Sequence, residues 1–214
     1  MEFRELLPRR RMVRHYEPEP VQREVVERIV GTVRRAPSAG YSQGQRLLVV
    51  TSEEGRAEIV RIYSHAGWGA AEGREPWLES APVHILVGTR EDDYHERYRL
   101  PDKLDGGEEI DWPVPYWFVD AGAALMLLLL AAIDEGLAAG VSGIPLDVAS
   151  ALRESFGIPE DVTLVALVTI GHPAVDPGWS AVTSRRTQPR RAPAEVVRWY
   201  TADGSDLPVD PSAD

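Results

Sequence analysis

The sequence predicts one central β-sheet covered by helices, in an α/β or an α+β arrangement. Three short apolar runs of strand length lie at Arg46–Thr51, Val83–Thr89 and Val162–Ile170, and segments with helical periodicity separate them. A 13-residue apolar run, Ala121–Ile133, predicts a helix that is buried on nearly every side. At 214 residues and 43% hydrophobic, the chain is expected to form one domain with a substantial core.

The helices are predicted from periodicity and from the residues that end them. Valine and isoleucine recur at helical spacing in Pro20–Arg35, and Pro20 suits a first helical turn. The segment Ala36–Gly40 ends this helix in a loop. Because Glu91–Pro115 is polar and punctuated by Gly and Pro, we expect a long excursion there. The remaining helices are predicted at Glu53–Ser64, Tyr116–Gly136, Leu146–Phe156 and Ala194–Tyr200.

Charge is distributed unevenly along the chain. The net charge is −11, yet residues 1–46 carry ten Arg and six Glu, whereas residues 47–184 carry eight basic and 23 acidic residues. This acidic middle argues against a nucleic-acid partner. Two arginine clusters are either solvated surface or a site for a phosphate or carboxylate, which guanidinium groups bind in pairs of hydrogen bonds. They are Arg9–Arg11 with Arg14, and Arg185-Arg186 with Arg190-Arg191.

Several kinds of site are excluded or disfavoured. The chain has no cysteine, which rules out disulfides, thiolate metal sites and a cysteine nucleophile. The five histidines lack metal-ligand spacing, so we expect no metal site. Ser142 lacks the glycine spacing of a nucleophile elbow, and Gly67–Gly73 does not fit the dinucleotide fingerprint. The N-terminus lacks the apolar region of a signal peptide, and Ala121–Ile133 is too short to span a membrane, which favours a cytoplasmic protein.

One combination of short motifs extends over most of the chain. The arginine-rich Arg10–Arg14 precedes the first helix, and Ala36–Gln43, with the sequence Ala-Pro-Ser-Ala-Gly-Tyr-Ser-Gln, follows it. Further motifs occur downstream at Asp120–Ala124, Glu135–Leu137, Gly157–Pro159, Gly171–Pro173 and Gln188–Pro193. In this order and spacing, over about residues 9–200, the sequence resembles the FMN-dependent nitroreductase family.

The resemblance implies a fold and an assembly. The fold is an α+β sandwich with a central mixed, mainly antiparallel sheet flanked by helices, in an intertwined homodimer with FMN at the subunit interface. Residues 1–200 would form a single FMN-binding domain, with a variable lid at about residues 66–117, and residues 201–214 an acidic tail. The tryptophans of the excursion are alternatively a small cluster that packs its own loop.

The resemblance also implies which arginines hold the cofactor. Arg10 and Arg14 would grip the FMN phosphate or ribityl hydroxyls, with Arg11 and the Met12 backbone beside the ring. From the second cluster, Arg191 and Arg190 would complete the phosphate site. The two arginine-rich ends of the chain would therefore converge on one phosphate.

Two further segments are implied to contact the flavin ring. The loop that follows the first helix would lie against the flavin of the second subunit, and a small-residue loop would lie under the isoalloxazine with a backbone N–H toward N5. The residues of the first loop are Pro37, Ser38, Ala39, Tyr41 and Gln43; those of the second are Gly140, Val141, Ser142 and Gly143.

The implied activity is ping-pong hydride transfer from NAD(P)H through FMN to a small-molecule electron acceptor such as a nitroaromatic or a quinone. The flavin carries this chemistry, so no acid or base side chain is required. Met12 and Tyr41 replace the usual Ser and Asn, which keeps open a flavin-sequestering protein without turnover. A specialised flavin reaction such as reductive dehalogenation is a third reading. Relatives that form dimethylbenzimidazole carry Asp at the position of Met12, which argues against that activity.

Overall fold

The computed structural model describes residues 2–67, 77–175 and 191–199, and the chain divides into two units, residues 1–175 and 176–214. In the second unit, the described residues include one short helix, α9 (Pro193–Val196). The helices of the first unit are α1 (Phe3–Arg9), α2 (Arg23–Gly31), η1 (Thr32–Arg35), η2 (Ala39–Tyr41), α3 (Glu53–His65), α4 (Trp77–Ser80), α5 (Asp92–Tyr98), α6 (Tyr116–Asp134) and α7 (Leu146–Phe156). Its strands are β1 (Gln45–Val50), β2 (Val83–Arg90), β3 (Ala138–Gly143) and β4 (Val162–Gly171).

The strands form one sheet in the order β1-β2-β4-β3. Every pairing in the described sheet is antiparallel, so the mixed character expected from the resemblance is not seen there. The central pair β2 and β4 runs from Val83 opposite Ile170 to Arg90 opposite Val162. Strands and helices of this kind confirm the α+β class.

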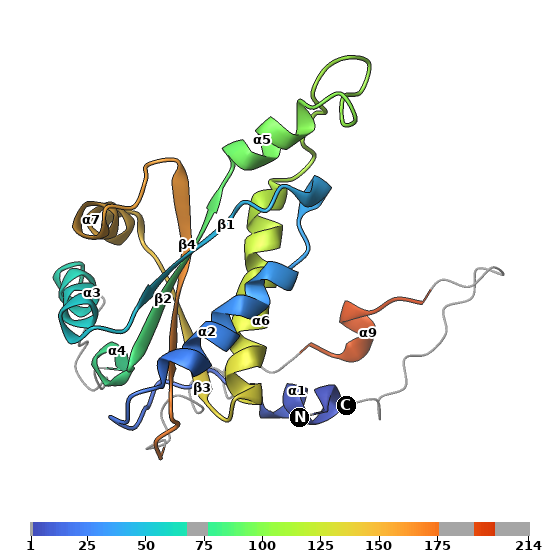
Figure 1. The fold of residues 1–214 in the computed structure, drawn as a ribbon. Helices are drawn as coiled ribbons and strands as arrows, with labels where there is room; N and C mark the ends of the chain where they lie inside the picture. The colour runs from blue at the N-terminus through green and yellow to red at the C-terminus, as the bar shows by residue number, and fades with distance from the viewer. Residues whose placement is uncertain (1, 68–76, 176–190, 200–214) are drawn as a thin grey trace. The chain divides into compact units, whose positions relative to one another are not determined.

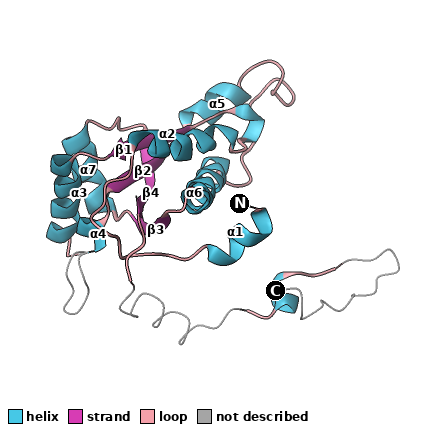
Figure 2. Ribbon diagram, turned by 60° about the horizontal axis from the view of Figure 1, so that its bottom comes forward, coloured by secondary structure: helices cyan, strands magenta, loops and turns pink. Residues whose placement is uncertain are grey.

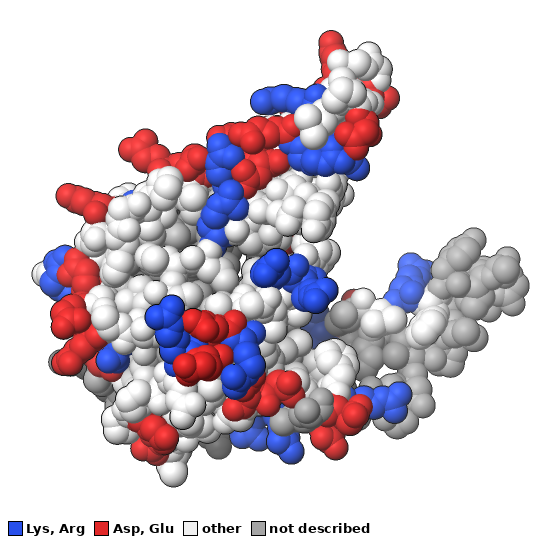
Figure 3. Space-filling view, viewed as in Figure 1, with Lys and Arg blue, Asp and Glu red and all other residues white. Residues whose placement is uncertain are grey.

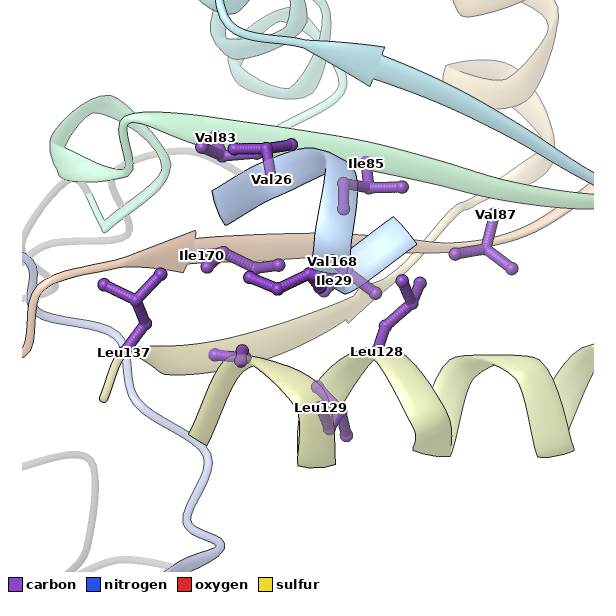
Figure 4. Packing of buried hydrophobic residues seen from close by; sticks show 12 residues of the cluster. Val26, Ile29, Val83, Ile85, Val87, Leu128, Leu129, Leu137, Val168 and Ile170 are labelled. Atoms are coloured by element: carbon purple, nitrogen blue, oxygen red, sulfur yellow. The ribbon is translucent and has the colours of Figure 1, made fainter. Parts of the chain in front are cut away.

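Helices cover both faces of the sheet (Figures 1 and 2). Because side chains alternate along a strand, Ile85 and Val168 point to the face covered by α2 and α6, and they pack against Leu128 of α6 (Figure 4). Leu86 and Leu167 point to the opposite face, which α3 and α7 cover. The result is a three-layer sandwich with a core on either side of the sheet.

The central helix α6 is 19 residues long and lies against the sheet (Figure 1). Ala124, Leu128 and Ala132 are fully buried on the side that faces the strands. Met126, within the apolar run, is 43% exposed, and Phe118 and Val119, just before the run, are 42% and 57% exposed. The sequence predicted burial on nearly every side, and this prediction is wrong for a single chain. By length and composition alone α6 could cross a membrane, but the core helix of a soluble protein satisfies the same criteria.

The structure corrects three of the predicted elements and adds one unpredicted helix. The helix expected over Pro20–Arg35 begins at Arg23 and tightens into a 3₁₀ turn after Gly31. The excursion contains α5, whose seven residues are too few to show a clear period. α1 was not expected, and it carries Pro8 inside the helix. α9 spans four residues, fewer than the Ala194–Tyr200 prediction.

The fourth strand, β3, is the most important correction. Residues 140–143 were expected to form a loop, whereas they are the second half of β3, paired with β4 from Ala138 opposite Gly171 to Gly143 opposite Ala166. Their sequence, Ala-Ala-Gly-Val-Ser-Gly from Ala138 onward, has little intrinsic strand preference. Pairing with β4 and burial of Ala138 and Ala139 impose the strand.

Candidate functional site

The arginine-rich N-terminal segment runs along the outer edge of β3. The backbone N–H of Val13 donates to the carbonyl oxygen of Ala139, with an N–O distance of 3.0 Å. Gly140 allows this close approach, because a side-chain carbon at this position would collide with the Val13 carbonyl oxygen. The structure therefore brings Arg10–Arg14 and residues 140–143 together.

Tyr16 fixes this contact from inside the molecule. Its side chain is 5% exposed, and its hydroxyl donates to the Val13 carbonyl at 2.8 Å and meets the Thr169 hydroxyl, also at 2.8 Å. Burial raises the pKa of Tyr16, against smaller opposing effects of the Thr169 hydrogen bond and the Arg14 charge. The phenol therefore remains protonated and acts as a structural donor.

The three arginines of the segment remain available to a ligand. Among the described residues, no carboxylate forms an ion pair with Arg10, Arg11 or Arg14. The Arg14 guanidinium lies 5.4 Å from the centre of the Trp77 ring, a cation–π distance. The intervening Met12 is 40% exposed. Three cationic side chains without carboxylate partners among the described residues form a candidate anion-binding segment, called the anion-binding segment below.

The edge of β3 adds backbone donors next to these arginines. In an antiparallel strand, the backbone groups of successive residues point to alternate edges. Since the Ala139 carbonyl faces Val13 at the outer edge, the backbone groups of Val141 and Gly143 face the same edge. The Gly143 carbonyl accepts from the Tyr63 hydroxyl at 3.1 Å. This edge therefore presents N–H donors beside the anion-binding segment.

The loop after η1 adopts a strained conformation. Gly40, Tyr41 and Gln43 have φ angles of 60°, 63° and 55°, a left-handed region that Tyr and Gln seldom occupy. The Ser38 hydroxyl accepts from the Gln43 backbone N–H at 3.0 Å and closes the turn. The Tyr41 side chain is 75% exposed. An exposed aromatic ring in a strained loop is typical of a functional segment.

The loop and the anion-binding segment are far apart within one chain. The Ala39 backbone N–H donates to Asp120 Oδ2, near the start of α6, at 2.8 Å. Residues 137–139, which hold the anion-binding segment, follow the end of the same helix. At 1.5 Å per residue, these two ends of α6 are about 20 Å apart. A single chain therefore does not unite the two halves of the predicted site.

The predicted contribution of the second arginine cluster is not tested by the structure. Arg190 lies outside the described residues. Arg191 belongs to the second unit, where its guanidinium lies 3.9 Å from Glu195. Its convergence with Arg10 and Arg14 remains a prediction.

Comparison with known proteins identifies the family. The family model described as "Nitroreductase family" matches residues 7–172, which include the anion-binding segment, the strained loop and all four strands. The chain belongs to the nitroreductase family.

Curated relatives of this nitroreductase-family chain carry the names of several flavin enzymes. FMN reductase [NAD(P)H] of Bacillus subtilis is 29% identical over 190 residues, which cover 87% of this chain and 68% of the relative. 5,6-Dimethylbenzimidazole synthase of Rhodobacter capsulatus is 29% identical and matches 79% of this chain and 82% of its own. Iodotyrosine deiodinase of Nematostella vectensis is 24% identical and matches 82% and 68%.

Solved structures show the same fold. A nitroreductase family protein from Clostridium difficile 630 superposes with a TM-score of 0.66 at 24% identity, over 94% of this chain and 99% of that one. NADPH:FMN oxidoreductase from Vibrio harveyi, complexed with NAD+, gives a TM-score of 0.61 at 22% identity, over 81% and 69%.

In this nitroreductase-family chain, several acidic side chains in and near the excursion Glu91–Pro115 form ion pairs with arginines. Acidic and basic side chains alternate over α5 and the residues around it (Figure 3). Arg90 pairs with Asp93 and with Asp161 at 2.5 and 2.6 Å, and Arg97 pairs with Asp102 at 2.6 Å. These pairs give the acidic residues involved a structural role.

Aromatic rings pack beneath these ion pairs. Trp112 lies 6.3 Å from Tyr94, 4.5 Å from Tyr98 and 5.8 Å from Trp117, measured between ring centroids. Glu109 accepts from the Trp112 indole at 2.7 Å and also contacts His95. Burial lowers the pKa of His95, but Glu109 and Glu91 outweigh it and raise that pKa overall. Two tryptophans of the excursion, Trp112 and Trp117, thus pack in one aromatic cluster with Tyr94 and Tyr98.

Sequence reasoning missed the residues that hold both halves of the site. Asp120 was part of a recognised motif, but its contacts with Ala39 and Tyr94 were not foreseen. A lone carboxylate beside a 13-residue apolar run was the available signal, since a buried charge needs donors. Tyr16 and Thr169 gave no such signal, because their contact depends on the fold.

Proposed function

We propose that this chain is an FMN-dependent NAD(P)H oxidoreductase that reduces a small electron-poor acceptor such as a quinone or nitroaromatic. The contact of Arg10–Arg14 with the edge of β3 carries the proposal, because it places three cationic side chains beside backbone donors. The names of the relatives, among them FMN reductase [NAD(P)H], support the same cofactor and reductant.

The residues present fit the chemistry of FMN. A phosphate dianion requires several charge-assisted donors, and Arg10 and Arg14 supply them without competing carboxylates among the described residues. Arg11 and the Met12 backbone lie on the same segment, toward the ring in our proposal. Val141 and Gly143 direct backbone groups to the edge that would face the ring. Gly140 keeps that edge close to the arginines.

FMN, when bound, would supply the hydride-transfer chemistry between NAD(P)H and the acceptor, at N5 of its ring. The chain's own residues bind and orient. Backbone N–H groups of Val141 and Gly143 would donate toward the N5 edge, and the arginines would hold the phosphate, assisted by Arg190 and Arg191. No side chain is required as an acid or a base in this scheme.

We propose a homodimer in which α6 packs between the protomers. Phe118, Val119 and Met126 leave an exposed apolar face on α6, and burying it against a second copy is favourable. A second copy would also bring the loop at Pro37–Gln43 to the flavin, which a single chain does not do across about 20 Å of helix. Residues 1–200 would then form one FMN-binding domain per subunit, with the excursion at about residues 66–117 above the flavin.

Reconstitution tests this function. Purified full-length protein is incubated with FMN, freed of excess flavin, and reduced anaerobically with NADH or NADPH while the flavin absorbance is followed. We expect stoichiometric FMN, bleaching by at least one nucleotide, and reoxidation by a panel of quinones and nitroaromatics. Failure to retain FMN contradicts the proposal.

A matched pair of variants identifies the phosphate site. Arg14→Ala should weaken FMN binding by about ten- to a hundredfold, the effect of losing a charge-assisted hydrogen bond. Arg23→Ala removes an arginine that pairs with Glu27 on the surface of α2, and should leave FMN affinity unchanged. Equal effects of the two changes would exclude the assigned site.

The reconstituted protein also distinguishes two alternative functions from the proposed one. A flavin that binds but is reduced by neither nucleotide favours sequestration, which Met12 and Tyr41 keep in view. Reductive dehalogenation is favoured if reduced enzyme releases iodide from an iodophenol, and the similarity to iodotyrosine deiodinase motivates that assay.

A further inference from the structure

Asp120 is a buried carboxylate that joins two separate segments. It is 6% exposed, and its Oδ2 accepts from the backbone N–H of Ala39 and from the Tyr94 hydroxyl, both at 2.8 Å. Ala39 belongs to the strained loop, and Tyr94 is a fully buried residue of α5. Because a buried carboxylate is costly without donors, the two contacts depend on each other.

Helix α5 also contacts the strained loop directly. Arg97 Nε donates to the Gly40 carbonyl at 2.9 Å. A side-chain carbon at Gly40 would lie 2.5 Å from the Tyr98 ring, and one at Gly44 would collide with the Tyr94 ring. The loop is therefore held both by α5 and by Asp120.

These contacts account for the strained conformation. Tyr41 and Gln43 are the non-glycine residues with positive φ in the described part of the chain, and they lie within three positions of each other. Left-handed conformations of this kind persist only where surrounding contacts impose them. Besides the Ser38–Gln43 bond within the loop, these contacts include the Asp120 bond at Ala39, the Arg97 bond at Gly40 and the Tyr94 ring against Gly44.

We propose that Asp120 is a positioning residue for the flavin reaction, acting through Ala39 and Tyr94 to set the strained loop and to couple it to α5. This role rests on the proposed function, in which the loop contacts FMN. Tyr94 packs against Trp112 at the far end of the excursion. A change in the position of α5 would therefore reach the loop through Asp120 as well as through the Arg97 contact with Gly40.

Tyr94→Phe is the most selective variant, because it deletes one hydroxyl and keeps the ring. Asp120→Asn is the conservative partner, since its amide oxygen can still accept from Ala39 and Tyr94. Ile62→Val removes a methyl group from a buried residue of α3, on the opposite face of the sheet. It serves as the control for general destabilisation.

The first measurement needs no flavin. Hydrogen–deuterium exchange at the Ala39 amide and at the amides of α5 is compared between the full-length wild type and the three variants. Tyr94→Phe should accelerate exchange in both segments by about tenfold, the weight of one hydrogen bond to a charged group. Ile62→Val should leave exchange in both segments at wild-type rates. Asp120→Asn should give rates between those of the wild type and of Tyr94→Phe. Unchanged exchange in Tyr94→Phe overturns the proposal.

The second measurement uses FMN. Tyr94→Phe should raise the FMN dissociation constant about tenfold and alter the visible circular dichroism of the bound flavin, with partial recovery in Asp120→Asn. If exchange accelerates while affinity and dichroism stay at wild-type values, the contact is only structural and the positioning role is overturned. A wild-type chain that binds no FMN overturns the proposed function itself, and this role with it.

Discussion

The Tyr16 hydroxyl and the Thr169 hydroxyl meet at 2.8 Å inside the molecule, at the point where the N-terminal segment crosses β3. Tyr16 also donates to the Val13 carbonyl. One buried side chain therefore links β4 to the segment that carries Arg10, Arg11 and Arg14.

Tyr16→Phe should destabilise the protein by about 1–2 kcal/mol, because the Val13 carbonyl loses its donor and the Thr169 hydroxyl loses a partner. The measurement is urea unfolding, with FMN affinity followed in parallel. Thr169→Val tests the pair, since the two changes should be less than additive by about 0.5–1.5 kcal/mol. Strict additivity would show that the two hydroxyls do not interact.

Gly140→Ala should release the N-terminal segment from β3, because the added methyl group occupies the position of the Val13 carbonyl oxygen. We expect a loss of about 1–3 kcal/mol in unfolding free energy and a marked loss of FMN binding. Gly31→Ala is the control, since nothing lies within 4 Å of an added carbon there. It should be neutral or stabilising, by up to about 1 kcal/mol. Similar behaviour of the two variants would contradict the assigned contact.

Tyr41→Asn should stabilise the protein by about 0.5–1 kcal/mol, because Asn tolerates the left-handed conformation that Tyr41 adopts at φ 63°. Thermal or urea unfolding measures the change. Tyr41→Val, with a β-branched side chain at the same backbone angle, should destabilise instead. If both substitutions lower stability equally, the Tyr41 ring itself contributes to the folded state.

His84 should make stability depend on pH in a defined window. Burial lowers the pKa of His84 to about 4, assisted by the charge of Arg56 and opposed by the hydrogen bond to the Leu78 carbonyl. The unfolded chain, with a His pKa near 6.5, therefore binds more protons below that pH, and stability falls as the pH drops from about 6.5 to about 4. Through His84, the free energy of unfolding is about 3 kcal/mol higher above pH 6.5 than it is below about pH 4.

His84→Gln removes this titration. Urea unfolding at several pH values should show a shallower loss of stability between pH 6.5 and 4 than in the wild type. Identical slopes in the two proteins would mean that His84 has the same pKa in the folded and the unfolded state.

Local sequence patterns predicted the parts of the fold that local residues determine. β1, β2 and β4 follow from apolar runs, and α7 was expected over the same residues, Leu146–Phe156, that form it. β3 could not be predicted this way, because its small residues acquire strand geometry from β4.

The sequence named the segments of the candidate site, but it did not predict the contacts between them. The family resemblance indicated Arg10–Arg14 and residues 140–143, which the fold brings together through Val13 and Ala139. Those two residues are distant in sequence, and no local pattern links them. The contacts of Asp120 escaped prediction for the same reason, since they depend on how α5 and the strained loop meet on α6.

The contact between Tyr16 and Thr169 also orders events during synthesis. The two residues are 153 positions apart, so the arginine-bearing segment, made first, has no docking place until nearly all of the first unit has left the ribosome. A nascent or truncated chain that ends before β4 has arginines but lacks the strand to which Tyr16 bonds. The proposed cofactor site would therefore be completed late, together with the sheet.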